Sequence, residues 1–431
     1  MLRQQEQLNL FWALGGSMTA IIRSLSLATL VLSLGLVGRP AVADETIKLG
    51  YIEALSGPFA SVGDVALKTF GYILDKVNAQ GGALGKKFEL VPFDDKLQPA
   101  EALIALKAIT DQNIPFVLHC TGSNVGAALI DGVSKHNARN PDNKVLYLNC
   151  GALATELTNE KCDYWHFRFT GNIEMRAVAR VKALPKSVTK VYLLNQDYLA
   201  GQSMQRDTRK WLEKLRPDVQ IVGDELMPLG KVQDFSPYVS KIRTSGAQSL
   251  ITGNWGRDLN LLIKAAVDDG AEVRFDTYLA QVTGGATSIG SAGEKRLTTV
   301  TEFDINVPAE LNKPDAEAFI KGWRADHDTD LIGPPTTLFN MLAEAINKAG
   351  STDAQKVAQQ LEGMKTTDLV GWPVEMRAED HQLLLPYYAT TFTREVKYDV
   401  EKTGLGWKTD FIVPVDDLTL PTNCKMKRPA S

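Results

Sequence analysis

Residues 47–95 have the sequence pattern of a complete strand–helix–strand unit. A short apolar strand, Ile47–Ile52, runs into the turn Ser56-Gly57-Pro58. The following helix repeats its apolar residues at the i, i+3, i+4 spacing of one buried face. A glycine pair, Gly81-Gly82, separates that helix from a second strand, which ends at Asp94-Asp95. In open α/β sheets small molecules bind at the carboxyl ends of such strands, so the first turn is a candidate ligand site.

The same alternation of strand and helix continues along most of the chain, which indicates the α/β class. Further strands are predicted at Pro115–His119, Val145–Asn149, Lys190–Leu194, Gln220–Leu226, Ser249–Gly253 and Arg274–Leu279. Helices are predicted at Pro99–Asp111, Gly126–Asn137, Ile173–Leu184, Gly201–Leu215, Phe235–Thr244 and Arg257–Asp269, then at Pro314–Trp323, Pro335–Ala349 and Thr352–Met364. A strand-rich tail begins at Tyr387. Apolar strands between amphipathic helices indicate parallel sheets covered on both faces, and two doubly wound lobes fit better than one very wide sheet.

Residues 1–43 have the composition of a secretory signal peptide. Leu25–Val37 is an apolar run preceded by Arg23 and followed by Ala41-Val42-Ala43, a small-x-small cleavage signal. The run is shorter than the roughly 20 residues of a spanning helix, so cleavage is a better interpretation than an uncleaved anchor. A start at Met18 would give a compact n-region. We therefore expect the remainder of the chain to be exported to the periplasm.

Length and charge limit the partners of the chain. Its 431 residues favour two domains, and repeats and low-complexity segments are absent from the sequence. The formal net charge of −4 at pH 7 argues against nucleic acid as a partner. The short basic tail Lys425–Arg428 is typical of a solvated terminus.

The four cysteines, Cys120, Cys150, Cys162 and Cys424, all lie in the part expected to be exported. An even number in an oxidising compartment indicates disulfides, and four cysteines allow three connectivities. Cys120 and Cys150 each end a predicted strand and are candidates for one bridge, while Cys162 with Cys424 would tie the tail to the body. Zinc binding is the weaker interpretation, because no C-x-x-C is present and the histidines are scattered.

The sequence contains no recognisable catalytic motif. It lacks H-E-x-x-H and G-x-S-x-G, and Gly285–Gly290 has the spacing of a phosphate loop without its lysine. Asp94-Asp95 point to opposite faces of a strand end, which favours a structural or capping role. Ser123 has no recognisable base, so hydrogen bonding is the better interpretation of its hydroxyl. We expect no enzyme activity, no cofactor and no metal.

Polar, glycine-containing turns follow many of the predicted strands. They are Ser56-Gly57-Pro58, Thr121-Gly122-Ser123, Asn149-Cys150-Gly151-Ala152, Asp197-Tyr198, Asn254-Trp255-Gly256 and Gln281. Several precede helix N-termini, whose free N–H groups and dipole favour anions such as carboxylates. Phe59, Tyr198 and Trp255 could cover an apolar body. Each aromatic residue alone is typical of core packing, but their shared placement after strands favours a pocket.

These turns carry a resemblance to a known family over essentially all of residues 46–398. The chain resembles the solute-binding proteins of ABC importers, in the branched-chain (Leu/Ile/Val-type) amino-acid class with the type I periplasmic binding fold. The markers, in order, are Leu55-Ser56-Gly57-Pro58 with Gly63-Asp64, Asn78-x-x-Gly81-Gly82 with Gly85-Lys86-Lys87, Asp94-Asp95 with Pro99, and Gln233-Asp234-Phe235-Ser236.

The resemblance implies two Rossmann-like lobes joined by a three-strand hinge, with a ligand between them and hinge closure on binding. Lobe 1 would comprise residues 44–166 and 305–370, and lobe 2 residues 172–300 and 377–431, tail included. The hinge crossovers would lie near 166–171, 301–304 and 371–376.

The family's ligand-binding positions match particular residues of this chain. The resemblance implies a carboxylate-binding turn at Thr121, Gly122 and Ser123, a second turn at Gly151, Ala152 and Leu153, and an aromatic wall at Trp255 with Tyr198 and Ala200 on the preceding loop. Where the amino-acid binders place a threonine for the α-ammonium this chain has Leu153, and where they place an acidic residue it has Gln281. A buried ammonium without acceptors is costly, so we expect a small carboxylate with an apolar or aromatic body as ligand.

Three classes of function remain open from the sequence. The first is the periplasmic binding component of an ABC importer. It would be a monomer whose partners are a small-molecule ligand and an inner-membrane permease, and the alternative ligands are a small carboxylate and a branched-chain amino acid. The second is an exported sensor module, which gene neighbourhood would distinguish. The third is an exported amidase or hydrolase, which would need a nucleophile–base pair in the cleft.

Overall fold

The computed structural model describes residues 46–281, 284–331 and 336–429. The predicted signal peptide at residues 1–43 lies outside these ranges. The described residues belong to one compact unit, Asp44–Ser431, which holds two separate β-sheets. No helix among them is long and apolar enough to cross a membrane.

The first sheet has eight strands in the order β11-β12-β13-β5-β4-β3-β1-β2. Five neighbouring strands are parallel: β1 (Ile47–Glu53), β2 (Phe88–Asp94), β3 (Phe116–His119), β4 (Leu146–Asn149) and β5 (His166–Arg168). Three short strands from late in the chain extend the edge beside β5: β11 (Lys365–Thr367), β12 (Pro373–Arg377) and β13 (Gln382–Leu384). The parallel strands are largely buried because helices cover both faces, as the near-continuous apolar runs predicted.

The second sheet has seven strands in the order β15-β14-β10-β9-β8-β6-β7. Its parallel strands are β6 (Lys190–Gln196), β7 (Gln220–Met227), β8 (Ser249–Thr252), β9 (Arg274–Thr277) and β10 (Leu297–Thr301). The antiparallel strands β14 (Tyr387–Thr393) and β15 (Gly406–Val413) complete the edge. Two α/β sheets confirm the predicted fold class.

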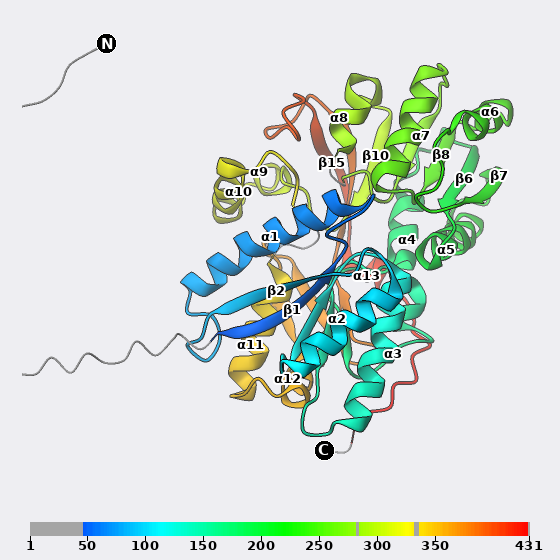
Figure 1. The fold of residues 1–431 in the computed structure, drawn as a ribbon. Helices are drawn as coiled ribbons and strands as arrows, with labels where there is room; N and C mark the ends of the chain where they lie inside the picture. The colour runs from blue at the N-terminus through cyan, green and yellow to red at the C-terminus, as the bar shows by residue number, and fades with distance from the viewer. Residues whose placement is uncertain (1–45, 282–283, 332–335, 430–431) are drawn as a thin grey trace, which may run out of the picture. The chain divides into compact units, whose positions relative to one another are not determined.

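The helices divide between the two sheets (Figure 1). With the first sheet lie α1 (Ala60–Ala79), α2 (Pro99–Asp111), α3 (Ser123–Arg139), α11 (Thr337–Ala349) and α12 (Ala354–Leu361), and we call this assembly lobe 1. With the second sheet lie α4 (Ile173–Ala183), α5 (Leu199–Leu215), α6 (Ser236–Thr244), α7 (Gly256–Asp268), α8 (Gly285–Ile289), α9 (Val307–Glu310) and α10 (Pro314–Asp326), and we call this assembly lobe 2. The short helix α13 (Val415–Leu418) contacts α4. The apolar face of α1 is buried at the residues that the periodicity selected.

The chain passes between the lobes at places that differ in part from the expectation. The first passage, at Phe169–Asn172 between β5 and α4, lies at the predicted crossover. The chain leaves the second sheet after Thr301, also as expected, but α9 and α10 still pack in the apolar cluster of lobe 2. Within the described part of 305–370, α11, α12 and β11 belong to lobe 1 but α9 and α10 do not, so assigning all of 305–370 to lobe 1 is wrong.

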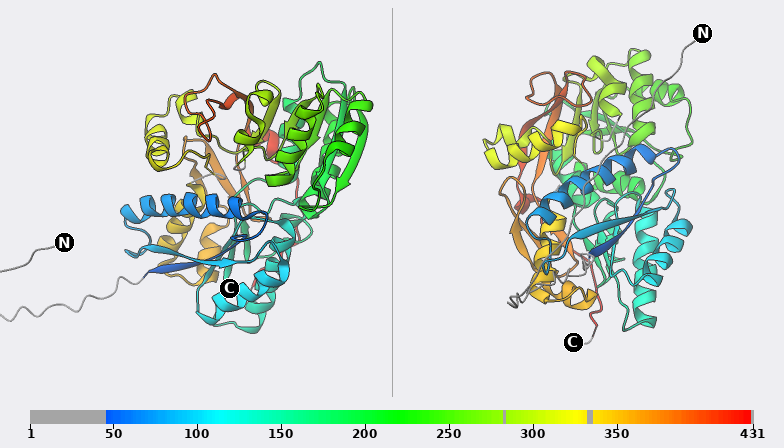
Figure 2. Two further views of the ribbon diagram at one scale, coloured as in Figure 1. Left: turned by 45° about the horizontal axis from the view of Figure 1, so that its top comes forward. Right: turned by 60° about the vertical axis from the view of Figure 1, so that its left-hand side comes forward.

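The third crossover also lies elsewhere. Residues 373–377 form β12 of the first sheet, so the predicted crossover at 371–376 is wrong, and the chain changes sheet at Leu385-Pro386. The sequence did not reveal this, because the short strands β11 to β13 are too brief for a periodic signal. The two turned views in Figure 2 show these late segments lying beside early ones in each lobe.

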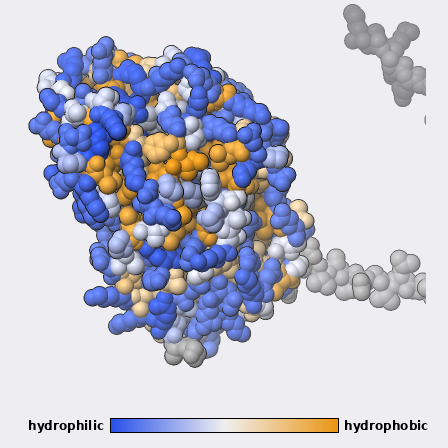
Figure 3. All heavy atoms as spheres, turned by 180° about the vertical axis from the view of Figure 1, so that it is seen from behind, coloured by the Kyte–Doolittle hydropathy of each residue, from blue (hydrophilic) through white to orange (hydrophobic). Residues whose placement is uncertain are grey.

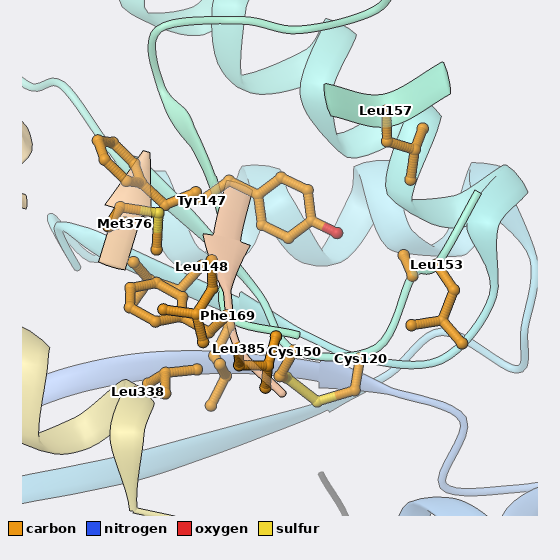
Figure 4. Packing of buried hydrophobic residues seen from close by; sticks show 14 of the residues in the cluster. Cys120, Tyr147, Leu148, Cys150, Leu153, Leu157, Phe169, Leu338, Met376 and Leu385 are labelled. Atoms are coloured by element: carbon orange, nitrogen blue, oxygen red, sulfur yellow. A yellow bond between two sulfur atoms is a disulfide. The ribbon is translucent and has the colours of Figure 1, made fainter. Parts of the chain in front are cut away.

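Two disulfides join distant parts of the chain, in the pairs considered from the sequence. Cys120 at the end of β3 pairs with Cys150 at the end of β4, with Cα atoms 4.5 Å apart. Figure 4 shows this bridge at the strand ends, in the same apolar cluster as Leu153 and Phe169. Cys424 pairs with Cys162, so the end of the tail returns to lobe 1 and not to lobe 2 as expected.

Candidate functional site

One cavity lies where the carboxyl ends of the parallel strands of both lobes meet. It encloses about 890 Å³ of empty space, part of it open to solvent. Lobe 1 contributes the turns after β3 and β4, and lobe 2 contributes those after β6, β8, β9 and β10. This position is the one that open parallel sheets favour for ligands. On the face seen in Figure 3, apolar side chains gather in a band across the middle, between polar regions above and below.

The first lobe 1 turn leads directly into a long helix. Gly122, at φ 97°, precedes Ser123, the first residue of the 17-residue helix α3. A Cβ on Gly122 would lie 2.5 Å from Leu97 Cδ1, so the turn requires glycine. The Ser123 hydroxyl accepts a hydrogen bond from the Ala154 amide at 3.1 Å, which links this turn to the next one. The wall here is therefore a helix N-terminus, which favours an anion.

Thr121 connects the cavity to a buried carboxyl. Burial raises the pKa of Glu53, while hydrogen bonds from Thr121, the Ala54 amide and the Tyr51 hydroxyl oppose that rise. Asp95, also fully buried, has its pKa raised to about 7 by burial, with the Glu53 charge adding to the rise. Two carboxyls with raised pKa values thus lie behind the turn.

The second lobe 1 turn is held by Asn149, the last residue of β4. Its side-chain oxygen accepts from the Gly151 and Ala152 amides at 3.1 and 2.8 Å, and its amide group donates to the Ala152 carbonyl at 3.0 Å. A Cβ on Gly151 would lie 2.8 Å from the Cys120 carbonyl oxygen, so the disulfide partners and this glycine pack against each other. Leu153 lines the cavity and supplies an apolar surface.

Aromatic side chains form the opposite wall and bridge the lobes. Trp255, between β8 and α7, donates its indole N–H to the Tyr198 hydroxyl at 3.0 Å. Phe59 of lobe 1 packs on Trp255 of lobe 2, with ring centroids 4.3 Å apart. Both rings are nearly fully buried. This contact closes one side of the cavity across the two lobes.

An ion pair lies in the wall on the lobe 2 side. Arg176 of α4 and Glu302, directly after β10, are 5% and 4% exposed, and both line the cavity. Arg176 Nη2 donates to Glu302 Oε1 and Oε2 at 2.6 and 2.5 Å. Burial alone would raise the pKa of Glu302, but the Arg176 charge and hydrogen bonds from Thr170 and Tyr387 hold it below its ordinary value. Glu302 is therefore an ionised carboxylate neutralised by arginine.

Gln281 lines the cavity beside a second pair of carboxyls. Its amide group donates to Asp304 Oδ2 at 3.2 Å. Burial raises the pKa of Asp304, with the charge of Asp330 adding to the rise, and burial raises the pKa of Asp330 to about 7. Two such close carboxyls favour sharing a proton.

Most of the residues selected from the sequence line this cavity. They are Thr121, Gly122, Ser123, Gly151, Leu153, Tyr198, Ala200, Trp255 and Gln281. Phe59 lies behind Trp255, and Ala152 is buried away from the cavity, so neither is part of the lining. Sequence reasoning missed Arg176 and Glu302. Glu302 follows a strand end, as the selected turns do, and that position could have identified it. Arg176 sits within a helix and carries no such signal.

His119 and Asp94, two potential acid–base groups, are each engaged in hydrogen bonds within lobe 1. The His119 ring bonds to the Tyr147 hydroxyl and the Thr121 carbonyl, so it is not a base for Ser123. Asp94 accepts bonds from Leu55 and Ser56 and has a structural role, as predicted. No group of three or more potential metal ligands occurs among the described residues.

The fold and the cavity define a two-lobed binding protein of the type I periplasmic class. The chain belongs to the periplasmic binding protein family, whose model matches residues 46–396. Leu/Ile/Val-binding protein homolog 4 of Brucella abortus (strain 2308) is 28% identical over 407 residues, covering 92% of this chain and 96% of the relative. Family members are substrate-binding proteins of transporters, and the relatives place the chain in the branched-chain amino-acid class of ABC importers.

Solved structures agree with this assignment. The closed form of a leucine-, isoleucine-, valine-, threonine- and alanine-binding protein from Brucella ovis is 29% identical, with a TM-score of 0.79, covering 89% of this chain and all of that one. An R. palustris solute-binding protein in complex with 4-hydroxybenzoate has a TM-score of 0.73 at 19% identity, covering 86% and 97% of the two chains. At that identity the likeness concerns the fold alone.

Proposed function

We propose that this protein captures a small carboxylate with an apolar or aromatic body in the periplasm and presents it to an ABC permease. The observation that carries the proposal is one cavity that combines a helix N-terminus in lobe 1 with an apolar, aromatic wall in lobe 2. A ligand that touches both lobes stabilises the closed arrangement, and the permease would recognise that form. The protein would act as a monomer.

The carboxylate would lie at the turn Thr121–Ser123. The first amides of α3 have no partner within the helix, and the helix dipole adds a favourable partial charge. The apolar body would contact Leu153, Tyr198 and Trp255. Such a division of one polar end and one apolar body is typical of small-molecule sites.

The ammonium group of an amino acid would find few acceptors in this cavity. Leu153 offers none. Gln281 offers only its neutral side-chain oxygen, since its amide nitrogen donates to Asp304 Oδ2. Glu302 Oε1 already accepts from Thr170, Gly171, Arg176 and Tyr387. These commitments favour a ligand without an ammonium group.

A hydrophobic amino acid is the second candidate ligand, and one observation favours it. Glu302 Oε2 accepts from Arg176, whereas four bonds reach Oε1, so Oε2 has acceptor capacity for an ammonium. The names of the relatives from Brucella point in the same direction. This alternative keeps the same fold, cavity and transport role.

A thermal-shift screen separates the two candidates. Purified 44–431 is tested against leucine, isoleucine, valine and phenylalanine, and against benzoate, 4-hydroxybenzoate and short aliphatic acids. A specific ligand at 100 times its Kd adds about 2.7 kcal/mol of stability, which is visible as a shift of a few degrees.

Stabilisation by the acids, and much weaker binding of the matching primary amide, is expected. Stabilisation by leucine and not by the acids would replace the proposed ligand with the second candidate. If the amide bound as tightly as the acid, the carboxylate could not lie at Thr121–Ser123.

A further inference from the structure

The Glu302 carboxylate receives hydrogen bonds from one passage between the lobes and from the first residue of the strand that follows another. Thr170 Oγ1 and the Gly171 amide, in the passage from β5 to α4, donate to Oε1 at 2.6 and 3.1 Å. The Tyr387 hydroxyl, directly after the passage from β13, donates to the same oxygen at 2.7 Å. Arg176 completes the group from the first turn of α4. One carboxylate thus holds the first passage, and the start of the strand after the third, to the end of β10.

Arg176 is fixed in turn by lobe 2. Its Nη1 donates to the carbonyl oxygens of Tyr278 at 3.1 Å and Val300 at 3.4 Å, beyond the ends of β9 and within β10. Gly171 packs directly against the Tyr387 ring, because a Cβ on Gly171 would lie 2.1 Å from the Tyr387 hydroxyl oxygen. A rotation of one lobe against the other changes backbone angles in the first passage, so it acts on the bonds from Thr170 and Gly171 to Glu302.

We propose that the Arg176–Glu302 pair is a positioning pair that holds the interlobe passages in the lobe-closed arrangement and couples that arrangement to ligand in the cavity. The inference rests on the proposed function only in taking the cavity as the ligand site. Thr170, Arg176 and Glu302 line the cavity. A ligand there excludes water from the pair, and hydrogen bonds to charged groups strengthen as the local dielectric falls. Because such coupling is reciprocal, stronger hydrogen bonds around the Arg176–Glu302 pair raise the affinity for ligand.

The chain supplies a matched control one helical turn away. Arg180, also on α4, pairs with Asp276 of β9 at 3.1 Å, and both are fully buried. The Thr298 hydroxyl bonds to both members of that pair. All of these residues belong to lobe 2, so this second pair joins no interlobe passage and does not line the cavity.

Two hydroxyl deletions test the proposal, because they leave both charges paired. Tyr387→Phe removes the bond from the start of β14, where the Tyr387 hydroxyl lies against Gly171 of the first passage, and Tyr387 is not part of the cavity lining. Its control is Tyr192→Phe, because the Tyr192 hydroxyl donates to Glu225 within lobe 2. Thr170→Val removes the bond from the first passage, and its control is Thr298→Val.

The first readout needs no ligand. Spin labels are placed at Lys135→Cys and Glu213→Cys, near the carboxyl ends of α3 and α5, and the interlobe distance is measured by pulsed electron paramagnetic resonance. Both sites are exposed, and all native cysteines are in disulfides. The wild type is expected to contain a short-distance population, with a closed-to-open ratio about tenfold higher than in Tyr387→Phe, which is the effect of one hydrogen bond to a charged group.

The two controls are expected to keep the wild-type distribution. Three results would each overturn the proposal. They are an unchanged distance distribution in Tyr387→Phe and Thr170→Val, an equal shift in all four variants, and a wild type without the short-distance population. The second readout uses leucine and benzoate as probes. For whichever binds the wild type, Kd should weaken in Tyr387→Phe by the ratio of the closed fractions measured for the two proteins, and stay constant in Tyr192→Phe. If neither probe binds, the ligand assignment fails, whereas the distance measurement still decides on the pair.

Discussion

Removing the two disulfides one at a time should separate stability from binding. The variant Cys120→Ala with Cys150→Ala removes the bridge between the ends of β3 and β4, and both of these residues line the cavity. The variant Cys162→Ala with Cys424→Ala removes the bridge that ties the tail to lobe 1, away from the cavity. The second variant therefore controls for the loss of a disulfide as such.

The expected loss of stability follows from loop closure in the unfolded chain. For a sequence separation of 30 the chain-entropy relation gives about 3.6 kcal/mol, and for a separation of 262 about 5.6 kcal/mol. The actual loss for the Cys162–Cys424 bridge should be smaller than this value, because the released tail also gains conformational freedom in the folded state. We expect both variants to lose about 3–5 kcal/mol of unfolding free energy.

Ligand affinity should distinguish the two variants. Cys120 and Cys150 immediately precede the turns at Thr121 and Gly151, so losing their bridge lets both turns move apart, and affinity should fall at least tenfold. Urea unfolding followed by circular dichroism measures the first quantity, and calorimetry with a compound from the screen measures the second. If the tail variant lost as much affinity as the cavity variant, or if the cavity variant bound normally, the reasoning would be refuted.

Three further changes have defined outcomes. Trp255→Ala should lower ligand affinity at least 30-fold, about 2 kcal/mol, because it removes part of the cavity wall and the contact with Phe59. Trp255→Phe should lower affinity only about fivefold. Titration calorimetry on the folded variants measures both affinities, and values equal to the wild type would exclude Trp255 from the site. Gly151→Ala should weaken binding without unfolding the chain, because its Cβ would collide with Cys120; an unchanged Kd would contradict this. Asp95 has a folded-state pKa of about 7, above its unfolded value, so the folded state binds the extra proton and stability falls as pH rises from about 4 to 7. Asp95→Asn should therefore gain up to about 4 kcal/mol relative to the wild type between pH 4 and pH 8 in urea melts, and a constant difference would show that the carboxyl stays ionised.

Much of the fold could be predicted because its signals are local. The helix α2 has the predicted limits, Pro99–Asp111, since a proline at its start and regular apolar spacing mark it within a few residues. The turns at Thr121–Ser123 and Trp255 were found in the same way, because strand ends of a parallel sheet meet at one edge.

The late part of the chain was harder to assign. The helices α9 and α10 were expected in lobe 1, yet their apolar residues Ala316, Ile320 and Trp323 pack with the second sheet. Their periodicity predicts that one helix face is buried, but it does not predict which of the two sheets that face packs against. The third passage was misplaced because β11 and β12 are short, rich in polar residues and only partly buried, unlike the four-residue apolar strands β3 and β4 that the sequence did reveal.

The sequence by itself indicated the α/β alternation, the two lobes and the candidate cysteine pairs, and it selected turns that line the cavity. These depend on spacing and residue type along a short stretch of chain. Only the tertiary structure decided which helices cover which sheet and that Arg176, Glu302 and Tyr387 meet. The pair and its tyrosine come from α4, the end of β10 and the start of β14, 126 residues apart for Arg176 and Glu302 and 85 for Glu302 and Tyr387. No local pattern encodes such a meeting, because it depends on how the first passage and the start of β14 fold back onto one buried carboxylate.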